Sequence, residues 1–120
     1  MFEPGQHLRL QDMLQSCRDV QEHCDGLTRE QFLSSKLVYQ AVLWNLTVLG
    51  EAANHLPERT VEAHLDIPWS AIIGMRHRLV HGYGSIDPLI VWEVVQTGIP
   101  TLIPQLKALL EPSTREDSNG

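Results

Sequence analysis

Two long segments carry apolar residues at steps of three and four, and this repeat limits the chain to helical structure there. The first covers about residues 6–24 and the second about 34–56. Such steps place side chains on one face of an α-helix, whereas no segment alternates as a strand would. The second segment has a wide apolar arc, which predicts a central helix with more than one neighbour. The stripe of the first comprises Leu10, Met13, Leu14, Cys17, Val20 and Cys24.

Shorter signals complete an all-α architecture. Thr28 with Gln31 three positions later has the pattern of a capping box and predicts a short helical turn. The polar stretch 57–67 has room for another turn. We therefore expect an antiparallel four-helix bundle with short extra turns, formed by residues 1–111. Residues 112–120 are polar, lack apolar anchors and are expected to be a flexible tail.

The last two main helices have recognisable ends. A third helix is expected over 68–81, with Gly82 as a left-handed cap just past its last residue. An Asp-Pro start signal opens a fourth helical segment over 87–110. Pro100 and Pro104 should bend or break that segment, because proline removes a backbone donor and clashes with the preceding turn.

Composition narrows the functional classes. The chain has 120 residues, 42% hydrophobic residues and a net charge of -6, which fits one folded domain and argues against nonspecific coating of nucleic acid. No apolar run is long enough for a membrane span and no leader is recognisable, so a cytoplasmic protein is expected. Cys17 and Cys24 lie seven apart on one helix, too far for a disulfide, and should be reduced and at least half-buried.

The stretch "GMRHRLVHGY", residues 74–83, concentrates titratable cations at the end of the third helix. Arg76 and His81 are five apart and point in different directions by default, but the long arginine can reach towards the histidine at the helix end. An imidazole moves protons at neutral pH, and a guanidinium holds a phosphate bidentately. The pair suits metal-free phosphodiester cleavage, in which the 2′-hydroxyl of RNA supplies the nucleophile.

Arg76, His81 and Tyr83 together resemble the R-x4-H-x-Y signature of the HepT toxins, a branch of the HEPN superfamily. The resemblance extends over "NLTVLGEAA" (45–53), "IPWSAIIGMRHRLVHGY" (67–83) and "DPLIVWEVVQTGIPTLIPQL" (87–106). It implies a HEPN-like helical bundle that forms a symmetric homodimer, with the R-x4-H sites facing a shared cleft. It also implies a metal-independent endoribonuclease without a cofactor, in which Arg76 binds phosphate and His81 is the catalytic histidine.

The same resemblance implies a partner. HepT proteins are the toxins of type VII-like toxin–antitoxin systems, and an MNT-type nucleotidyltransferase antitoxin neutralises them by AMPylation of the motif tyrosine. Here that residue is Tyr83, and AMP groups would add bulk and negative charge where an RNA phosphate must lie. The RNA is expected to be tRNA or mRNA. The alternative is a catalytically inactive HEPN module that binds a nucleotidyltransferase or a nucleotide.

The chain departs from the family pattern at three positions. His77 follows the arginine where relatives usually have asparagine or aspartate, although an imidazole can still support phosphate binding. Gly84 replaces a bulky residue after the tyrosine and should loosen the loop. Trp44 stands where relatives often carry a basic residue, which removes one phosphate contact.

Several residues allow a purely structural interpretation. His77 and His81 share a helix face and have the spacing of a two-histidine metal pair, but no third ligand is apparent, so no metal site is predicted. Arg76 can form a salt bridge with Glu51 of the second helix while keeping a catalytic role. Asn45 and Glu51 either orient the catalytic pair or lie at an exposed helix edge. Trp69 and Trp92 are interpreted as packing residues of the core or a dimer.

Overall fold

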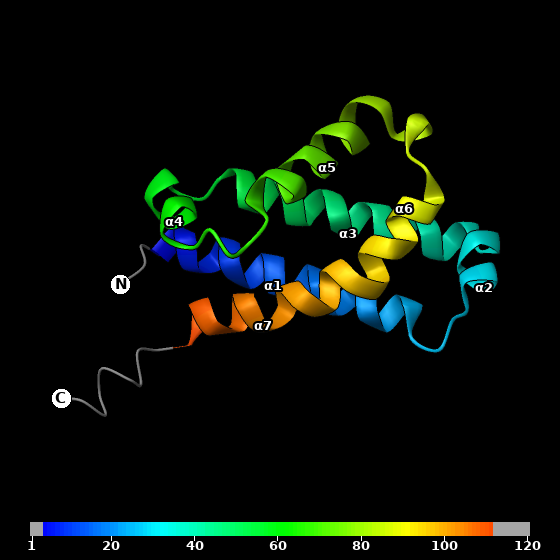
Figure 1. Cartoon of the computed structure of the whole chain (residues 1–120), viewed down its shortest axis with the longest axis horizontal. Helices are drawn as coiled ribbons and strands as arrows, with labels where there is room; N and C mark the ends of the chain where they lie inside the picture. Colours follow the sequence, from blue (N-terminus) through cyan, green and yellow to red (C-terminus); the bar gives the residue numbers. More distant parts are fainter. Residues whose placement is uncertain (1–3, 112–120) are drawn as a thin grey trace.

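The computed structural model describes residues 4–111, and within them every regular element is helical (Figure 1). The all-α prediction is confirmed, and no strand occurs in this part of the chain; the expected tail 112–120 lies outside it. The elements are α1 (Pro4–Cys24), α2 (Arg29–Ser34), α3 (Lys36–Asn54), α4 (Glu58–Ala63), α5 (Trp69–Gly82), the 3₁₀ turn η1 (Tyr83–Ser85), α6 (Pro88–Glu93), the π-helical turn η2 (Val94–Gly98) and α7 (Ile99–Leu110).

Side-chain caps set several of these boundaries. At α2 the capping box is complete: the Gln31 amide donates to Thr28 Oγ1 at 3.1 Å, and the Thr28 amide donates to Gln31 Oε1 at 2.9 Å. Ser35 ends α2 and caps α3, accepting a hydrogen bond from the Val38 amide at 3.2 Å. Asp87 accepts from the Leu89 amide at 2.9 Å and starts α6 as predicted. Each bond satisfies a donor that the first helical turn leaves free.

The main helices pack side by side in the order α7, α1, α3, α5 (Figure 1). The closest pairs are α1 with α3, α3 with α5 and α1 with α7, and each pair runs antiparallel. The central position of α3 is therefore confirmed. Among the described helices, α5 and α7 do not pack extensively against each other, so the four main helices form a row, and the expected antiparallel four-helix bundle is not confirmed. No helix within residues 4–111 has both the length and the apolar composition needed to cross a membrane.

The core lies along the inner faces of α1, α3 and α7. Met13, Val42 and Leu106 are fully buried there, and Phe32 of α2 packs against the rings of Tyr39 and Trp92. Both cysteines are free and buried, as predicted. Burial raises the pKa of the Cys17 thiol to about 12, so it is neutral and unreactive at physiological pH. All other members of the first helix's predicted stripe are buried as well.

Two predictions about helix ends are corrected. Gly82 is the last residue of α5 and not a left-handed cap; Gly26, at φ 76°, is the only described residue with positive φ. The chain continues from Gly82 into η1, and the Ser85 hydroxyl donates to the Gly82 carbonyl at 2.7 Å. In the fourth segment the α-helix is interrupted by η2 just before Pro100, as expected near that proline, whereas α7 continues through Pro104 without a break. Pro104 is exposed, so water can satisfy the carbonyl that loses its donor.

Candidate functional site

The third predicted helix, α5, lies directly against α3. At its start the indole of Trp69 is buried and donates to the His64 carbonyl at 2.9 Å, which fixes the entry of the chain into α5. Further along, Gly50 of α3 meets Arg76. A Cβ on Gly50 would overlap the Cβ of Arg76 and would lie 3.0 Å from the Ile72 carbonyl oxygen. A glycine at this position therefore allows the two helices to meet at the base of the Arg76 side chain.

Arg76 forms the ion pair that the sequence predicted. Its Nη2 lies 2.7 Å from Glu51 Oε1, and the second carboxylate oxygen lies 3.3 Å from Nδ1 of His55. The same His55 nitrogen is 2.8 Å from the Glu51 carbonyl oxygen. The Arg76 side chain is only 26% exposed, and its Nε is buried without a hydrogen-bond partner among the described residues. Glu51 therefore holds the guanidinium in one orientation.

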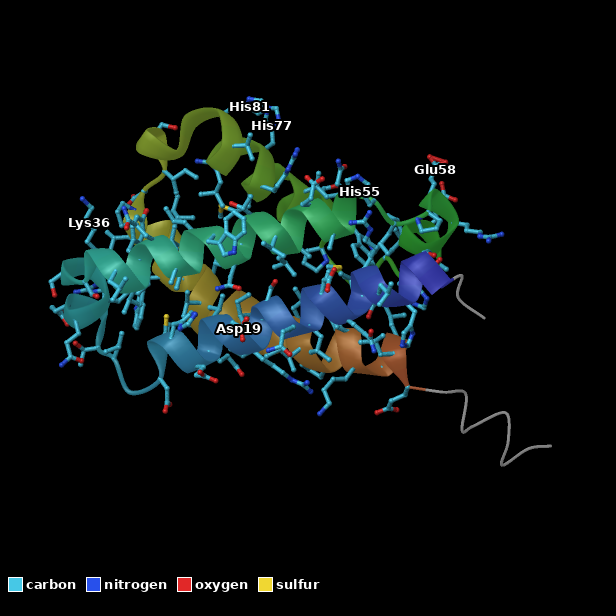
Figure 2. The ribbon with its side chains drawn as sticks, turned by 180° about the vertical axis from the view of Figure 1, so that it is seen from behind. Asp19, Lys36, His55, Glu58, His77 and His81 are labelled. Atoms are coloured by element: carbon cyan, nitrogen blue, oxygen red, sulfur yellow. The ribbon has the colours of Figure 1, made fainter. Side chains whose placement is uncertain are left out.

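His81 and His77 lie on the outer side of α5 and are exposed (Figure 2). Their ring centroids are 4.6 Å apart with the planes at 49°, so the two imidazoles share one helix face as predicted. Within the described residues no group of three or more His, Cys, Asp or Glu side chains is placed to hold a metal ion. The exposed rings can reach a substrate from solvent.

The supporting residues differ in their environment. Asn45 is buried, and its amide donates to the Ala41 carbonyl of its own helix at 3.0 Å. It is therefore not at an exposed edge, and its polar group is satisfied locally rather than by Arg76. Glu51, in contrast, contacts Arg76 directly. Tyr83 begins η1 immediately after α5, and the placement of its side chain lies outside what the structure describes.

An open groove runs along one side of Arg76 and has a volume of about 370 Å³. Its walls come from α1, α3 and α5, and include both members of the Arg76–Glu51 pair. Neither His77 nor His81 lines it. In the described part of one chain, no interaction joins Arg76 to His81; a second copy that completes the site stays a prediction. The lining residues are Arg9, Asp12, Trp44, Thr47, Val48, Glu51, Ala52, Arg76 and Val80.

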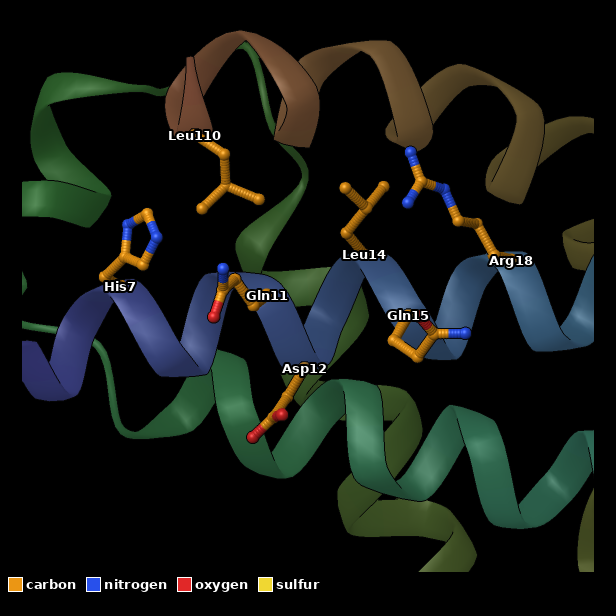
Figure 3. A pocket seen from close by; sticks show the side chains of 7 residues that line it. All are labelled: His7, Gln11, Asp12, Leu14, Gln15, Arg18 and Leu110. Carbon is orange, nitrogen blue, oxygen red and sulfur yellow. The ribbon is translucent and has the colours of Figure 1, made fainter. Parts of the chain in front are cut away.

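A second open groove lies between α1 and α7 (Figure 3). It contains none of the residues predicted for the site. Asp12 lines both grooves, whereas Arg18 and Leu110 belong to this one alone. The groove beside Arg76 is therefore the better candidate for a substrate.

Sequence reasoning missed two residues that shape the site. Gly50 stands in the middle of an apolar helix. An isolated glycine there indicates either a less stable helix or the close approach of another element. His55 follows Glu51 at a four-residue step, the spacing at which helical side chains meet. Both signals were present in the sequence.

The comparison with protein families covers this whole region. Residues 13–109 match the family described as "Ribonuclease HepT-like". The chain belongs to the HepT-like family. The match spans α3, α5 and the motif from Arg76 to Tyr83, and the HEPN resemblance is thereby confirmed.

Several curated proteins are similar to most of the chain. One is "Putative RNase TTE0752" of Caldanaerobacter subterraneus subsp. tengcongensis, 34% identical over 102 residues, which are 85% of this chain and 91% of the relative. "Putative RNase MJ0127" of Methanocaldococcus jannaschii is 30% identical over 92% of each chain. "Probable ribonuclease HepT" of Thermococcus cleftensis is 31% identical over 78% of this chain and 84% of the relative. No solved structure matches the chain significantly.

Proposed function

We propose that the protein is a metal-independent endoribonuclease that acts as the toxin of a toxin–antitoxin pair. The supporting observation is the arrangement on α5: Arg76 faces a groove, and His81 is an exposed imidazole at the end of the same helix. Membership of the HepT-like family, with relatives named as RNases, favours RNA as the substrate. The sites of two copies would together form the cleft for the strand.

The chemistry follows from these two groups. His81 would take the proton of the substrate's 2′-hydroxyl, or return one to the leaving oxygen. Arg76 would stabilise the charge that builds on the phosphate in the transition state. A guanidinium has five N–H donors, so binding of Nη2 to Glu51 leaves other donors for a phosphate. Glu51 would thus orient Arg76 without occupying all of its hydrogen-bond donors.

Two copies of the chain are needed in this proposal. Within one chain the described contacts pair Arg76 with Glu51 and His81 with His77. A symmetric homodimer would bring Arg76 of one copy towards His81 of the other. The substrate would be tRNA or mRNA, entering from solvent along the groove.

Incubation of the purified chain with RNA in excess EDTA tests the activity. We expect the RNA to be cut into shorter fragments, because neither proposed group requires a metal ion. RNA that stays intact, with the protein folded and free of any nucleotidyltransferase, would instead favour the alternative of an inactive module that binds its partner or a nucleotide.

Tyr83 is the proposed site of control. Coexpression with the cognate MNT-type nucleotidyltransferase should raise the mass of the protein in steps of one AMP and suppress cleavage, since the added phosphates repel RNA. Intact-mass spectrometry of wild type and Tyr83→Phe measures this. An unmodified wild type, or a modified Tyr83→Phe variant, would contradict the proposed switch.

A further inference from the structure

Trp44 is the one tryptophan that the fold leaves in solvent. Its neighbours in the chain, Leu43 and Asn45, are buried, whereas Trp44 is 68% exposed. Trp69 is buried, and Trp92 packs against Phe32. A large aromatic surface facing water in the middle of a well-packed helix contributes little to folding. This surface is therefore available to a ligand.

Trp44 shares the groove with Arg76. It precedes Glu51 by seven residues, two helical turns or about 10 Å along α3. Because α3 and α5 run antiparallel, the direction from Glu51 to Trp44 is also the direction from Arg76 towards Val80 and His81. Val80 lines the groove beside Trp44 and is 49% exposed. The indole thus lies on the side of Arg76 that leads to the histidine.

The groove also carries a cation from α1. Arg9 of α1 lines the groove and has no ion-pair partner among the described residues. The charge of Glu51 is offset by Arg76, which leaves Asp12 as the groove's one unpaired carboxylate in the described part of the chain. The groove thus combines an exposed aromatic face with the guanidinium groups of Arg9 and Arg76. Aromatic and cationic groups together are what a groove for single-stranded nucleic acid offers to bases and phosphates.

We propose that the Trp44 indole stacks on a nucleobase of single-stranded RNA and that the Arg9 guanidinium binds a phosphate of the same strand. The inference rests on the proposed ribonuclease function and extends its site beyond Arg76 and His81. Stacking on an aromatic ring tolerates any base, so Trp44 would hold the strand without reading its sequence.

Binding of a single-stranded 2′-deoxy oligonucleotide of about eight nucleotides tests the proposal, because the strand lacks the 2′-hydroxyl needed for cleavage. Trp44→Ala should weaken binding by about 5- to 150-fold, the loss expected from one stacked base. Trp44→Phe keeps an aromatic face and should recover most of the affinity. Leu65→Ala, which removes a side chain of similar exposure outside the groove, should bind like wild type.

Intrinsic fluorescence reports the contact directly. Addition of the oligonucleotide should quench the emission of wild type, and this quenching should be lost in Trp44→Phe, which retains Trp69 and Trp92. Two charge-removing variants give a second test, because they should change the oligonucleotide affinity in opposite directions. Arg9→Gln should weaken binding and reduce the slope of log affinity against log salt by about 0.7, whereas Asp12→Asn should strengthen binding.

Equal oligonucleotide affinity in wild type and Trp44→Ala, or quenching that persists in Trp44→Phe, would overturn the proposal. If Trp44→Ala binds the oligonucleotide like wild type but has a lower oligomeric state by light scattering, the surface would be assigned to a contact between protein chains instead. The two hypotheses fail separately. Cleavage of RNA in EDTA with unchanged Trp44→Ala affinity refutes only the stacking role, whereas Trp44-dependent binding without cleavage refutes only the ribonuclease.

Discussion

Replacement of His81 by alanine should reduce metal-free RNA cleavage by about 10²- to 10⁴-fold, the usual contribution of a general acid or base. The imidazole is exposed at the end of α5 and makes no described contact with the core. Its removal should therefore leave the fold intact. Initial rates on a labelled RNA in EDTA, with circular dichroism as the check on folding, measure the effect.

His77→Ala is the matched control. His77 is exposed on the same helix face and touches the His81 ring, so both variants lose an imidazole from one surface. A supporting hydrogen bond to phosphate accounts for a loss of roughly tenfold. Equal losses in the two variants would mean that this surface binds RNA through charge alone. Full activity of His81→Ala would place the proton transfer elsewhere.

Most of the helical structure could be predicted because its signals are local. The apolar repeats indicated α1 and α3, and the Thr28–Gln31 and Asp87–Pro88 patterns marked the starts of α2 and α6. These signals act within one helical turn, so tertiary packing does not need to be known. The second long helix was expected to start at about residue 34, whereas α3 starts at Lys36, after its cap Ser35. A difference of two residues is the usual uncertainty at a helix boundary.

The corrected elements lack a local signal that decides between the possible structures. Gly82 could end a helix with positive φ, but the Ser85 hydroxyl binds its carbonyl and the chain continues as a 3₁₀ turn. Pro100 signalled a disruption of the fourth segment, but not that it would take the form of a π-helical turn before the proline. The open row of helices is also a tertiary result, because an apolar stripe shows that a helix is covered and not by which neighbour.

The residues of the candidate site could be predicted from the sequence, but their relative positions in space could not. Arg76 pairs with Glu51 as the sequence suggested, since both lie at the α3–α5 contact. The chain alone did not indicate that Arg76 would face a groove and His81 the outer surface. That separation depends on how α5 is rotated against α3, and Gly50 lies at the point of contact.

Gly50→Ala should therefore lower both the stability and the cleavage activity. The added Cβ would overlap the Cβ of Arg76, and it would lie 3.0 Å from the Ile72 carbonyl oxygen. Both atoms are fixed by the backbone of α5, so no rotamer change relieves the overlap and the helices must separate. Overpacking of this kind costs about 1–3 kcal/mol, against a gain of up to about 1 kcal/mol from the better helix former. We expect a net loss of about 1–2 kcal/mol and a fall in Tm of roughly 4–8 °C.

Gly74→Ala supplies the control on the same pair of helices. Gly74 lies within α5, and a Cβ there would meet nothing within 4 Å. The substitution should raise stability by up to about 1 kcal/mol through helix propensity alone. Thermal unfolding of both variants, followed by circular dichroism, separates packing from propensity because only Gly50 lies at the contact. If Gly50→Ala were as stable as Gly74→Ala, α5 could not lie against α3 as described, and the orientation of Arg76 by Glu51 would lose its basis.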